Sequence, residues 1–435
     1  NGPRFRGPSR HRSIADTIGW SYALLPPPAA DLLDRLAVFA GPFTTADARR
    51  VAGSAAGDDQ FGQLLDELVN LSLVVAETSG SETMYRLLDT IRRFALDRLD
   101  RTDRRVEAFD RFADHAVTLA HDAFVMGTTS WDGLLRHLVA SFDTLTEALR
   151  WCLDHDREPD RAMTLCAVLW PVGRYPDTVG LARRVFERWP NTRNPIAADA
   201  TVTLAYGECT TGNPQVAAQL AEAQLARWTG RALASVTLRR ALGHTRIVMG
   251  DMAGAITAFR DGSRIARQLG FVEAALDLSV SEGEVEAHLG NVDAALAVLG
   301  HVRREAAAAR SGFNEATAAT SEAWVLVNRD GTAALPAVQH ALGLARAIEH
   351  RGAISANLRS LVHIHLQCDD LPAATATLRE WFESVVVWGG TSDARNIVGA
   401  AAVVAHRAGH ASWAAWAATE LQMPVQLLPS EVGAP

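Results

Sequence analysis

The chain has 435 residues, of which 48% are hydrophobic and 21% charged, and its formal net charge at pH 7 is −8. The length and composition are typical of a globular protein of roughly three domains. The negative net charge disfavours a nucleic-acid binder with a basic face. The sequence has no apolar run long enough for a membrane span, which disfavours a membrane protein. Every basic residue other than histidine is an arginine, which excludes chemistry that needs a P-loop or Schiff-base lysine. Four cysteines are scattered along the chain: Cys152, Cys166, Cys209 and Cys368. Their spacing indicates reduced core residues of a cytoplasmic protein and no metal site.

The first hundred residues carry signals for short helices followed by a hairpin. Ser13 and Asp16 form a capping-box pattern that opens a helix ending near Leu24, before a triple proline. The apolar periodicity then predicts three helices, at 30–39, 45–53 and 58–71. Thr44 or Thr45 is expected to cap the helix at 45–53.

The periodicity changes from 3.6 to 2 after these helices. Leu73–Glu77 and Met84–Leu88 are predicted as two strands of a hairpin around residues 78–81, and Asp89 is expected to cap a further helix. Three helices followed by a two-stranded wing indicate a winged-helix domain over residues 29–100.

These residues resemble a known family. Three segments carry the resemblance: RHRSIADTIGWSYALLPPPAADLLDRLAVFAGPFTTADARRVAG, LLDELVNLSLVVAE and YRLLDTIRRFALDRL. They are similar to the region that follows the nucleotide-binding core in bacterial STAND-type signalling ATPases. This family includes the AfsR-like and LuxR-like large regulators. The likeness continues through LTEALRWCLDHD and RAMTLCAVLWPVGR, so that it covers about Arg10 to Arg184.

The resemblance implies a regulatory role. An ATPase core that binds ATP or ADP would precede Arg10 in the parent protein, whereas this chain is expected to bind no cofactor and to catalyse nothing. Arg10, His11 and Arg12 would then contact the nucleotide-binding module of the same parent chain, although a solvated basic linker is the alternative.

DNA binding by the winged helix is a second alternative. The expected recognition helix contains two acids and no arginine over residues 61–71. A helix that enters the major groove needs donors for phosphates and bases. No direct binding of nucleic acid is therefore expected.

A pattern recurs every 38 to 40 residues through the C-terminal half of the chain. Each copy has a turn, at which in most copies glycine ends one helix and Asp or Asn caps the next, and an alanine lies five positions after its first residue. This pattern indicates a helical hairpin with a close helix–helix contact. The residues that define the repeat are Gly212, Ala217, Gly250, Ala255, Gly290, Ala295, Ala334, Ala374, Gly409 and Ala414. Second turns are expected at Gly230, Gly270, Gly312 and Gly352. The period exceeds the roughly 34 residues of a TPR unit, so the array is TPR-like.

The predicted fold is therefore mainly all-α. A linker and helix from the ATPase side (1–28) precede the winged-helix domain (29–100), an intermediate helical domain (101–195), a TPR-like solenoid (196–423) and a tail (424–435).

The solenoid is expected to bind a protein or a small-molecule inducer. Trp381 and Trp388 lie in its last repeats, where they either cap the core or form an aromatic partner surface. The favoured function is the sensor half of a signalling regulator whose winged helix relays ligand binding to the ATPase module. A freestanding TPR-like interaction scaffold is the main alternative.

Overall fold

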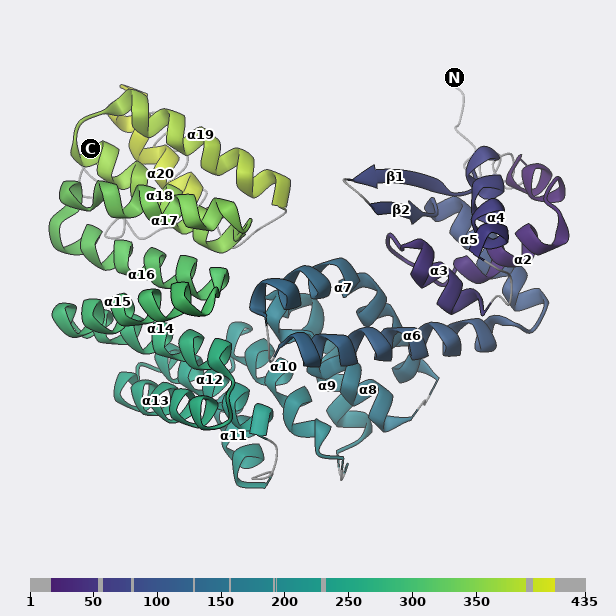
Figure 1. Cartoon of the computed structure of the whole chain (residues 1–435), viewed down its shortest axis with the longest axis horizontal. Coiled ribbons are helices and arrows are strands. Elements are labelled where there is room, and N and C mark those ends of the chain that lie inside the picture. Colours follow the sequence, from purple (N-terminus) through teal and green to yellow (C-terminus); the bar gives the residue numbers. More distant parts are fainter. Residues whose placement is uncertain are drawn as a thin grey trace, which may run out of the picture. The chain divides into compact units, whose positions relative to one another are not determined.

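The computed structural model describes residues 17–53, 58–79, 82–127, 130–155, 158–190, 192, 194–227, 232–388 and 394–410. The fold is almost entirely helical, with one two-stranded sheet in the described part (Figure 1). Contacts divide the chain into two compact units. The first comprises Asn1–Gly127 and Leu134–Ala234, and the second comprises Thr128–Gly133 and Ser235–Pro435.

The first unit begins with a winged helix. Its elements are α2 (Pro27–Leu36), α3 (Thr45–Ala52), α4 (Asp58–Asn70), β1 (Val75–Ser79), β2 (Glu82–Arg86) and α5 (Asp89–Arg101). Leu33, Phe43, Phe61 and Leu65 form the centre of its core and are at most 1% exposed. Phe43 also pairs with Tyr85 through the backbone, which joins the α2–α3 loop to the wing.

The predicted helix caps are partly right. Thr44 accepts a hydrogen bond from the Asp47 amide, and the Asp47 carboxylate accepts one from the Thr44 amide, which completes a capping box. Asp89, by contrast, is the first residue of α5, and no side chain caps this helix. The start of α2 is also earlier than predicted, at Pro27, because proline lacks only an N–H that the first helical turn does not use.

The strands differ from the prediction by two residues. Val75–Ser79 pairs with Glu82–Arg86, so the ladder runs two residues further toward the tip of the hairpin on both strands. Leu73 and Val74, predicted to start the first strand, instead donate their amides to the Leu68 carbonyl at the end of α4. Leu73 and Val74 have high β propensity, but their hydrogen bonds to the end of α4 exclude them from the strand.

The rest of the first unit consists of antiparallel helices. They are α6 (Arg105–Met126), α7 (Trp131–Asp154), α8 (Pro159–Ala167), the 3-10 turn η1 (Trp170–Val172), α9 (Tyr175–Arg188), α10 (Ile196–Thr210) and α11 (Pro214–Arg227). Hairpins are thus present before residue 196, where the solenoid was expected to start.

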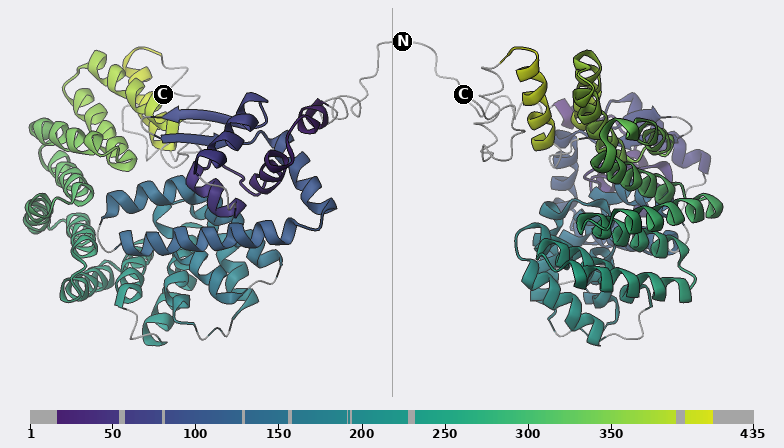
Figure 2. Two further views of the ribbon diagram at one scale, coloured as in Figure 1. Left: turned by 45° about the vertical axis from the view of Figure 1, so that its right-hand side comes forward. Right: turned by 90° about the vertical axis from the view of Figure 1, so that its left-hand side faces the viewer.

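The second unit stacks one hairpin on the next (Figure 2). Its helices are α12 (Ala232–Val248), α13 (Met252–Gln268), α14 (Val272–His288), α15 (Val292–Ala309), α16 (Gly312–Asp330), η2 (Gly331–Ala334), α17 (Leu335–Ala347), α18 (Arg351–Gln367), α19 (Leu371–Trp388) and α20 (Ala394–Arg407). The first helices of successive hairpins contact one another, α14 on α16 and α16 on α18. We call α12, α14, α16 and α18 the first-helix layer.

The repeat-defining residues occupy the positions that the period predicts. Gly212, Gly250, Gly290 and Gly409 have φ between 81° and 96°, the left-handed geometry that ends a helix. The described alanines of the pattern are at most 3% exposed: Ala217, Ala255, Ala295, Ala334 and Ala374. Ala414 lies outside the described residues.

Two of the expected second turns are displaced. Gly312 is the first residue of α16 and Gly352 the second residue of α18, while Arg310 and Glu349 hold the left-handed conformation instead. Gly230 lies outside the described residues. Gly270, with φ of 77°, is placed as expected. A strained non-glycine turn is held in place by the two helices that it joins, which a glycine search in the sequence does not detect.

Candidate functional site

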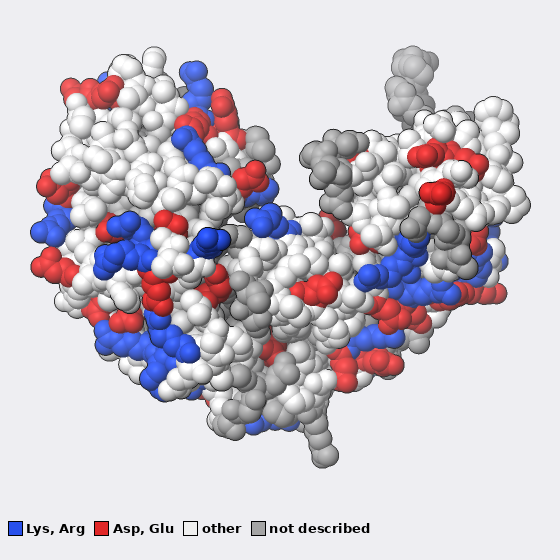
Figure 3. Space-filling model, in the orientation of Figure 1, with Lys and Arg blue, Asp and Glu red and all other residues white. Residues whose placement is uncertain are grey.

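The exposed face of α4, the expected recognition helix, is acidic. Asp59, Asp66 and Glu67 are exposed, whereas Phe61 and Leu68 on the opposite side are buried. Basic residues are absent from this helix, and the arginines that Figure 3 shows in blue lie beside red carboxylates on the face that it draws. Such a surface repels phosphates and suits packing against protein.

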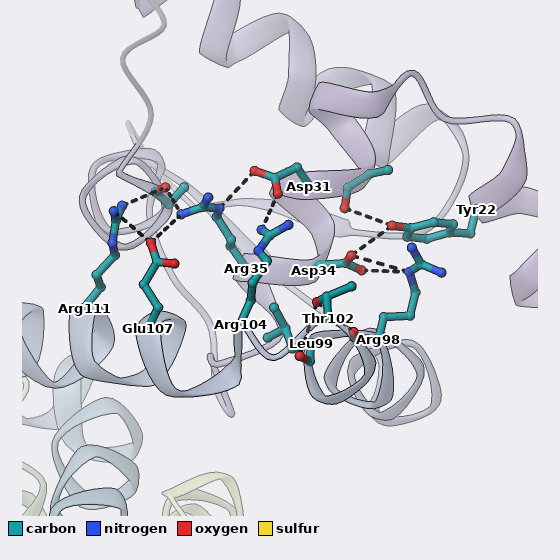
Figure 4. A network of polar contacts seen from close by, with 12 residues as sticks. Tyr22, Asp31, Asp34, Arg35, Arg98, Leu99, Thr102, Arg104, Glu107 and Arg111 are labelled. Carbon is teal, nitrogen blue, oxygen red and sulfur yellow. Dashed lines mark hydrogen bonds and ion pairs between the residues drawn. The ribbon is translucent and has the colours of Figure 1, made fainter.

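A network of arginines and carboxylates ties the winged helix to α6 (Figure 4). Asp31 of α2 accepts from Arg35 Nε at 2.9 Å and also contacts Arg104, which precedes α6. Glu107 of α6 lies 3.0 Å from Arg111 Nη2 and 3.7 Å from Arg35 Nη1. Since the pairs form a network rather than isolated surface bridges, they fix α2 relative to the start of α6.

The same arginines also bind the end of α3. Arg35 Nη1 and Arg111 Nη1 donate to the Ala52 carbonyl at 3.1 and 3.4 Å. Gly53 follows with φ of 59°, and a Cβ there would lie 1.6 Å from Arg111 Nη1. Positive charge at a helix C-terminus is favourable. Three helices of the unit therefore meet at two guanidinium groups.

A second part of the network surrounds Asp34, which is 3% exposed. Its Oδ2 accepts from Tyr22 Oη at 2.9 Å and from Arg98 Nε at 3.4 Å (Figure 4). Burial raises the pKa of Asp34 despite these partners, and burial together with the Asp34 carboxylate raises the pKa of Tyr22 to about 12. This carboxylate links the helix over residues 17–23 to α2 and α5.

The buried imidazole of His115 connects α6 to the capping box of α3. His115 Nε2 lies 3.1 Å from Asp47 Oδ1, and its ring packs edge-on against Phe39. Burial acts to raise the pKa of Asp47, but the hydrogen bonds from His115 and Thr44 outweigh it, so the pKa is lowered. The carboxylate that caps α3 thus also holds α6.

A cleft of about 350 Å³ lies beside this region of the first unit. Its lining residues are Ala40, Phe142, Asp143, Thr146, Arg150, Arg174 and Asp177. Arg174 lies 4.1 Å over the Phe142 ring and donates to Asp177 at 2.8 Å, while Arg150 pairs with Glu147 at 3.3 Å. Both guanidinium groups therefore already have carboxylate partners.

In the second unit, polar side chains join neighbouring helices of the first-helix layer. Arg240 binds Asp277 through two nitrogens at 2.5 and 3.3 Å. Ser321 Oγ donates to Glu284 Oε1 at 2.6 Å, and Asn357 Nδ2 donates to Thr320 Oγ1 at 2.8 Å. Each pair is separated by 37 residues, so the sequence period reappears as a ladder of contacts between repeats.

Glu284 and His288 of α14 face Ser321 and Trp324 of α16. The His288 ring stacks on the Trp324 ring at 4.9 Å, and its Nδ1 lies 2.8 Å from the Glu284 carbonyl oxygen. Glu284 and Trp324 are half-buried and His288 is exposed. Burial raises the pKa of Glu284, and the Asp277 carboxylate adds to the rise. The arrangement places a carboxylate and an indole ring at the surface of the first-helix layer.

The sequence-predicted site residues have different outcomes. Arg10, His11 and Arg12 lie outside the described residues, so their proposed contact stays a prediction. Trp381 is 0% exposed and donates its indole N–H to Ser355 Oγ at 2.6 Å, which makes it a core residue and not a partner surface.

Trp388 is the last residue of α19, and its side chain lies outside the described part. Of the four cysteines expected in the core, Cys368 is exposed.

One periodic feature escaped the sequence analysis. The side-chain amides of Asn213 and Asn291, at turn positions where Asp or Asn was expected to cap the next helix, donate to Glu208 and Glu286 at 2.9 and 2.8 Å. Each glutamate also accepts from an arginine of the preceding helix, Arg183 or Arg260. The Arg183 guanidinium holds the pKa of Glu208 below its usual range. The sequence carries a signal for this contact, because a glutamate stands five residues before each asparagine. The two glutamate–asparagine pairs are 78 residues apart.

Other site types receive no support in the described part of the chain. No three potential metal ligands are grouped there closely enough to hold an ion. None of its helices has the length and apolar character needed to cross a membrane.

Comparison with known proteins supports the winged helix of the first unit. Residues 25–100 match the family described as a winged helix-turn-helix domain. A Mycobacterium tuberculosis protein named as an HTH-type transcriptional regulator is 34% identical over 167 residues, 38% of this chain and 18% of that protein. An uncharacterized protein of Mycobacterium bovis is 36% identical over 107 residues, 24% of this chain and 27% of its own length. The chain thus spans about a fifth to a quarter of these relatives.

Among solved structures, a STAND protein with a tetratricopeptide repeat sensor from Pyrococcus horikoshii is 13% identical, with a TM-score of 0.49, over 97% of this chain and 65% of that one. A Rap protein complexed with competence and sporulation factor is 11% identical, with a TM-score of 0.48, over 86% of this chain and 98% of that one. The chain combines a winged helix-turn-helix domain, over residues 25–100, with TPR-like helical repeats.

Proposed function

We propose that this chain is the sensor half of a STAND-type regulator. The repeats bind a protein or a small-molecule inducer, and the winged helix relays the bound state to a nucleotide-binding module in the parent protein. The observation that carries the proposal is the network that joins α2, α3 and α6, because it gives the winged helix a built mechanical connection to the helices that follow.

The relay requires two states with different contacts. Asp31, Arg35, Glu107 and Arg111 supply ion pairs that one state can keep and the other can break. Coupling of this kind is typically worth about 1–3 kcal/mol. The chain itself holds no nucleotide in this proposal, and its setting is the cytoplasm.

The test uses a parent protein that contains the nucleotide-binding module. Deletion of residues 235–435 should raise the rate of nucleotide exchange, and changing Arg10 and Arg12 to Ala should alter nucleotide affinity or exchange. Asp293→Ala is the control, because this side chain is 94% exposed on α15. If the deletion and the double variant both exchanged nucleotide at the parent rate, the relay would be wrong and a freestanding scaffold would replace it.

The winged helix-turn-helix match keeps DNA binding as a second candidate function. The acidic face of α4 opposes it. Fluorescence anisotropy with a labelled random duplex at low salt separates the two readings. Salt-dependent binding by the chain, reduced by substitutions in α4, would favour the DNA-binding regulator.

A further inference from the structure

The carboxylates of α14 differ in how they are neutralised. Asp277 pairs with Arg240, and both Glu282 and Glu286 pair with Arg260. Within the described residues no ion pair is formed by Glu284, whose side chain accepts a hydrogen bond from Ser321. A half-buried carboxylate that accepts a hydrogen bond from a hydroxyl but forms no ion pair is costly, so its presence in the middle of the first-helix layer calls for a cationic partner.

The surroundings of Glu284 indicate the chemistry of that partner. One helical turn away, the stacked rings of His288 and Trp324 form an aromatic surface beside the carboxylate. Indole rings attract ammonium and guanidinium groups through the ring quadrupole, and carboxylates bind the same groups by charge-assisted hydrogen bonds. Glu284, Trp324 and Ser321 together therefore offer both elements of a cation site.

Repeat geometry adds a row of equivalent positions. Glu284, Trp324 and His363 follow one another at intervals of 40 and 39 residues, on α14, α16 and α18 of the first-helix layer. Neighbouring helices lie about 8–10 Å apart, so an extended peptide that crosses the layer passes these side chains in turn. A lone amine would use only one of them.

We propose that the first-helix layer binds an extended peptide segment and that Glu284, with Trp324, receives an arginine or lysine side chain of that segment. This inference rests on the proposed sensing function of the repeats and specifies the class of ligand. Asp277 is not the receptor, because its two oxygens are already bound by Arg240.

The test is a selection from a random nonapeptide library, acetylated and amidated at its ends so that only side chains carry charge. The full chain is compared with its Glu284→Gln and Glu282→Gln variants. The first substitution removes the charge but keeps a carbonyl oxygen as an acceptor for Ser321, while the second makes the same change on another side of the same helix. Thermal melting confirms that all three proteins are folded.

Wild type and Glu282→Gln should enrich peptides with arginine or lysine at one position. An enriched peptide should bind Glu284→Gln at least about tenfold more weakly, since a charge-assisted bond is lost. Trp324→Leu should weaken the same peptide severalfold, and Trp324→Phe less.

Enrichment of peptides without a basic preference, or equal binding by Glu284→Gln, would overturn the cation site while leaving ligand sensing intact. A library from which nothing is enriched would count against peptide sensing by the repeats as well. Competition by spermidine at the concentration of the peptide would show that a free polyamine suffices, which also contradicts the proposal.

Discussion

His244 shows how a single half-buried side chain makes stability depend on pH. Its ring packs edge-on against Phe259 at 5.1 Å. Burial, reinforced by the positive charge of Arg240, lowers its pKa to about 3 from an ordinary 6.5. The folded state therefore holds the neutral ring, while the unfolded state takes up a proton below pH 6.5. The free energy of unfolding is therefore unaffected by the ionisation of His244 above pH 6.5 and decreases as the pH falls from 6.5 toward 3.

We expect the fold to lose about 1–2 kcal/mol through His244 between pH 7.5 and pH 5. His244→Gln removes the titrating group, so its melting temperature should fall less over this interval than that of the wild type. His301→Gln is the control, because that side chain is 67% exposed. A wild-type pH slope in the His244 variant would show that the ring is protonated in the folded state.

The sequence offered little guidance at this scale. His244 and Glu284 are separated by one repeat, yet a period search that looks for glycine and alanine passes over both. Their environment depends on which side chain the adjacent helix supplies, Phe259 in one case and Ser321 in the other. The burial of Trp381 has the same origin, since its N–H finds Ser355 on α18.

At the scale of the helix, the alanine pattern makes a packing prediction. Ala295 of α15 is 0% exposed and packs in a cluster with Leu276, Val280 and Ala318. Ala295→Trp should overpack this contact and cost about 1–3 kcal/mol. Ala294→Trp, at the neighbouring exposed position, is the matched control. Equal melting temperatures for the two variants would mean that the repeat alanine does not determine helix spacing.

A second close contact involves a helical glycine. A Cβ at Gly243 of α12 would lie 2.4–2.8 Å from three atoms of the Phe259 ring, whereas nothing lies within 4 Å of a Cβ at Gly343 of α17. Gly243→Ala should therefore cost about 1–2 kcal/mol despite better helix propensity. Gly343→Ala should stabilise the protein by about 0.5–1 kcal/mol. Differential scanning calorimetry measures both, and a stabilised Gly243 variant would contradict this packing.

Elements with strong periodicity could be predicted from the sequence. Elements in which two hydrogen-bond partners compete for the same residue could not. The hairpin turns at Gly250 and Gly290 were placed correctly because glycine relieves the left-handed conformation. The wing strands were misplaced because Leu73 and Val74 bond back to α4. Asn291 failed as a cap because Glu286 bonds its amide. In both failures a hydrogen bond to a residue five or six positions earlier in the chain decided the outcome.

For the whole molecule, we expect no tight binding of ATP. The sequence has no lysine to reach the β- and γ-phosphates. Isothermal titration of the full chain with ATP and Mg²⁺ should give no heat of binding in the micromolar range, whereas a parent protein with its nucleotide-binding module should. Micromolar affinity in the chain alone would place a nucleotide site in the repeats or the winged helix.

The mainly α fold, the winged helix and the TPR-like array could all be predicted, because each has a local signature in composition or spacing. The network in Figure 4 could not. Arg35 lies one helical turn from Asp31 within α2, but only the arrangement of α2, α5 and α6 brings Arg104 to the same carboxylate. The contact between Glu284 and Ser321 was hidden for the same reason.

The ladder of contacts 37 residues apart has a consequence for how such a chain can change length. Arg240–Asp277, Ser321–Glu284 and Asn357–Thr320 each reach only the adjacent hairpin. An in-frame tandem duplication of one unit of about 40 residues therefore preserves the stacking of first helix on first helix, whereas loss of half a unit would bring a first helix against a second helix at the junction. Growth by whole units would lengthen the row that contains Glu284 and Trp324 and so add equivalent surface positions without disturbing those already present.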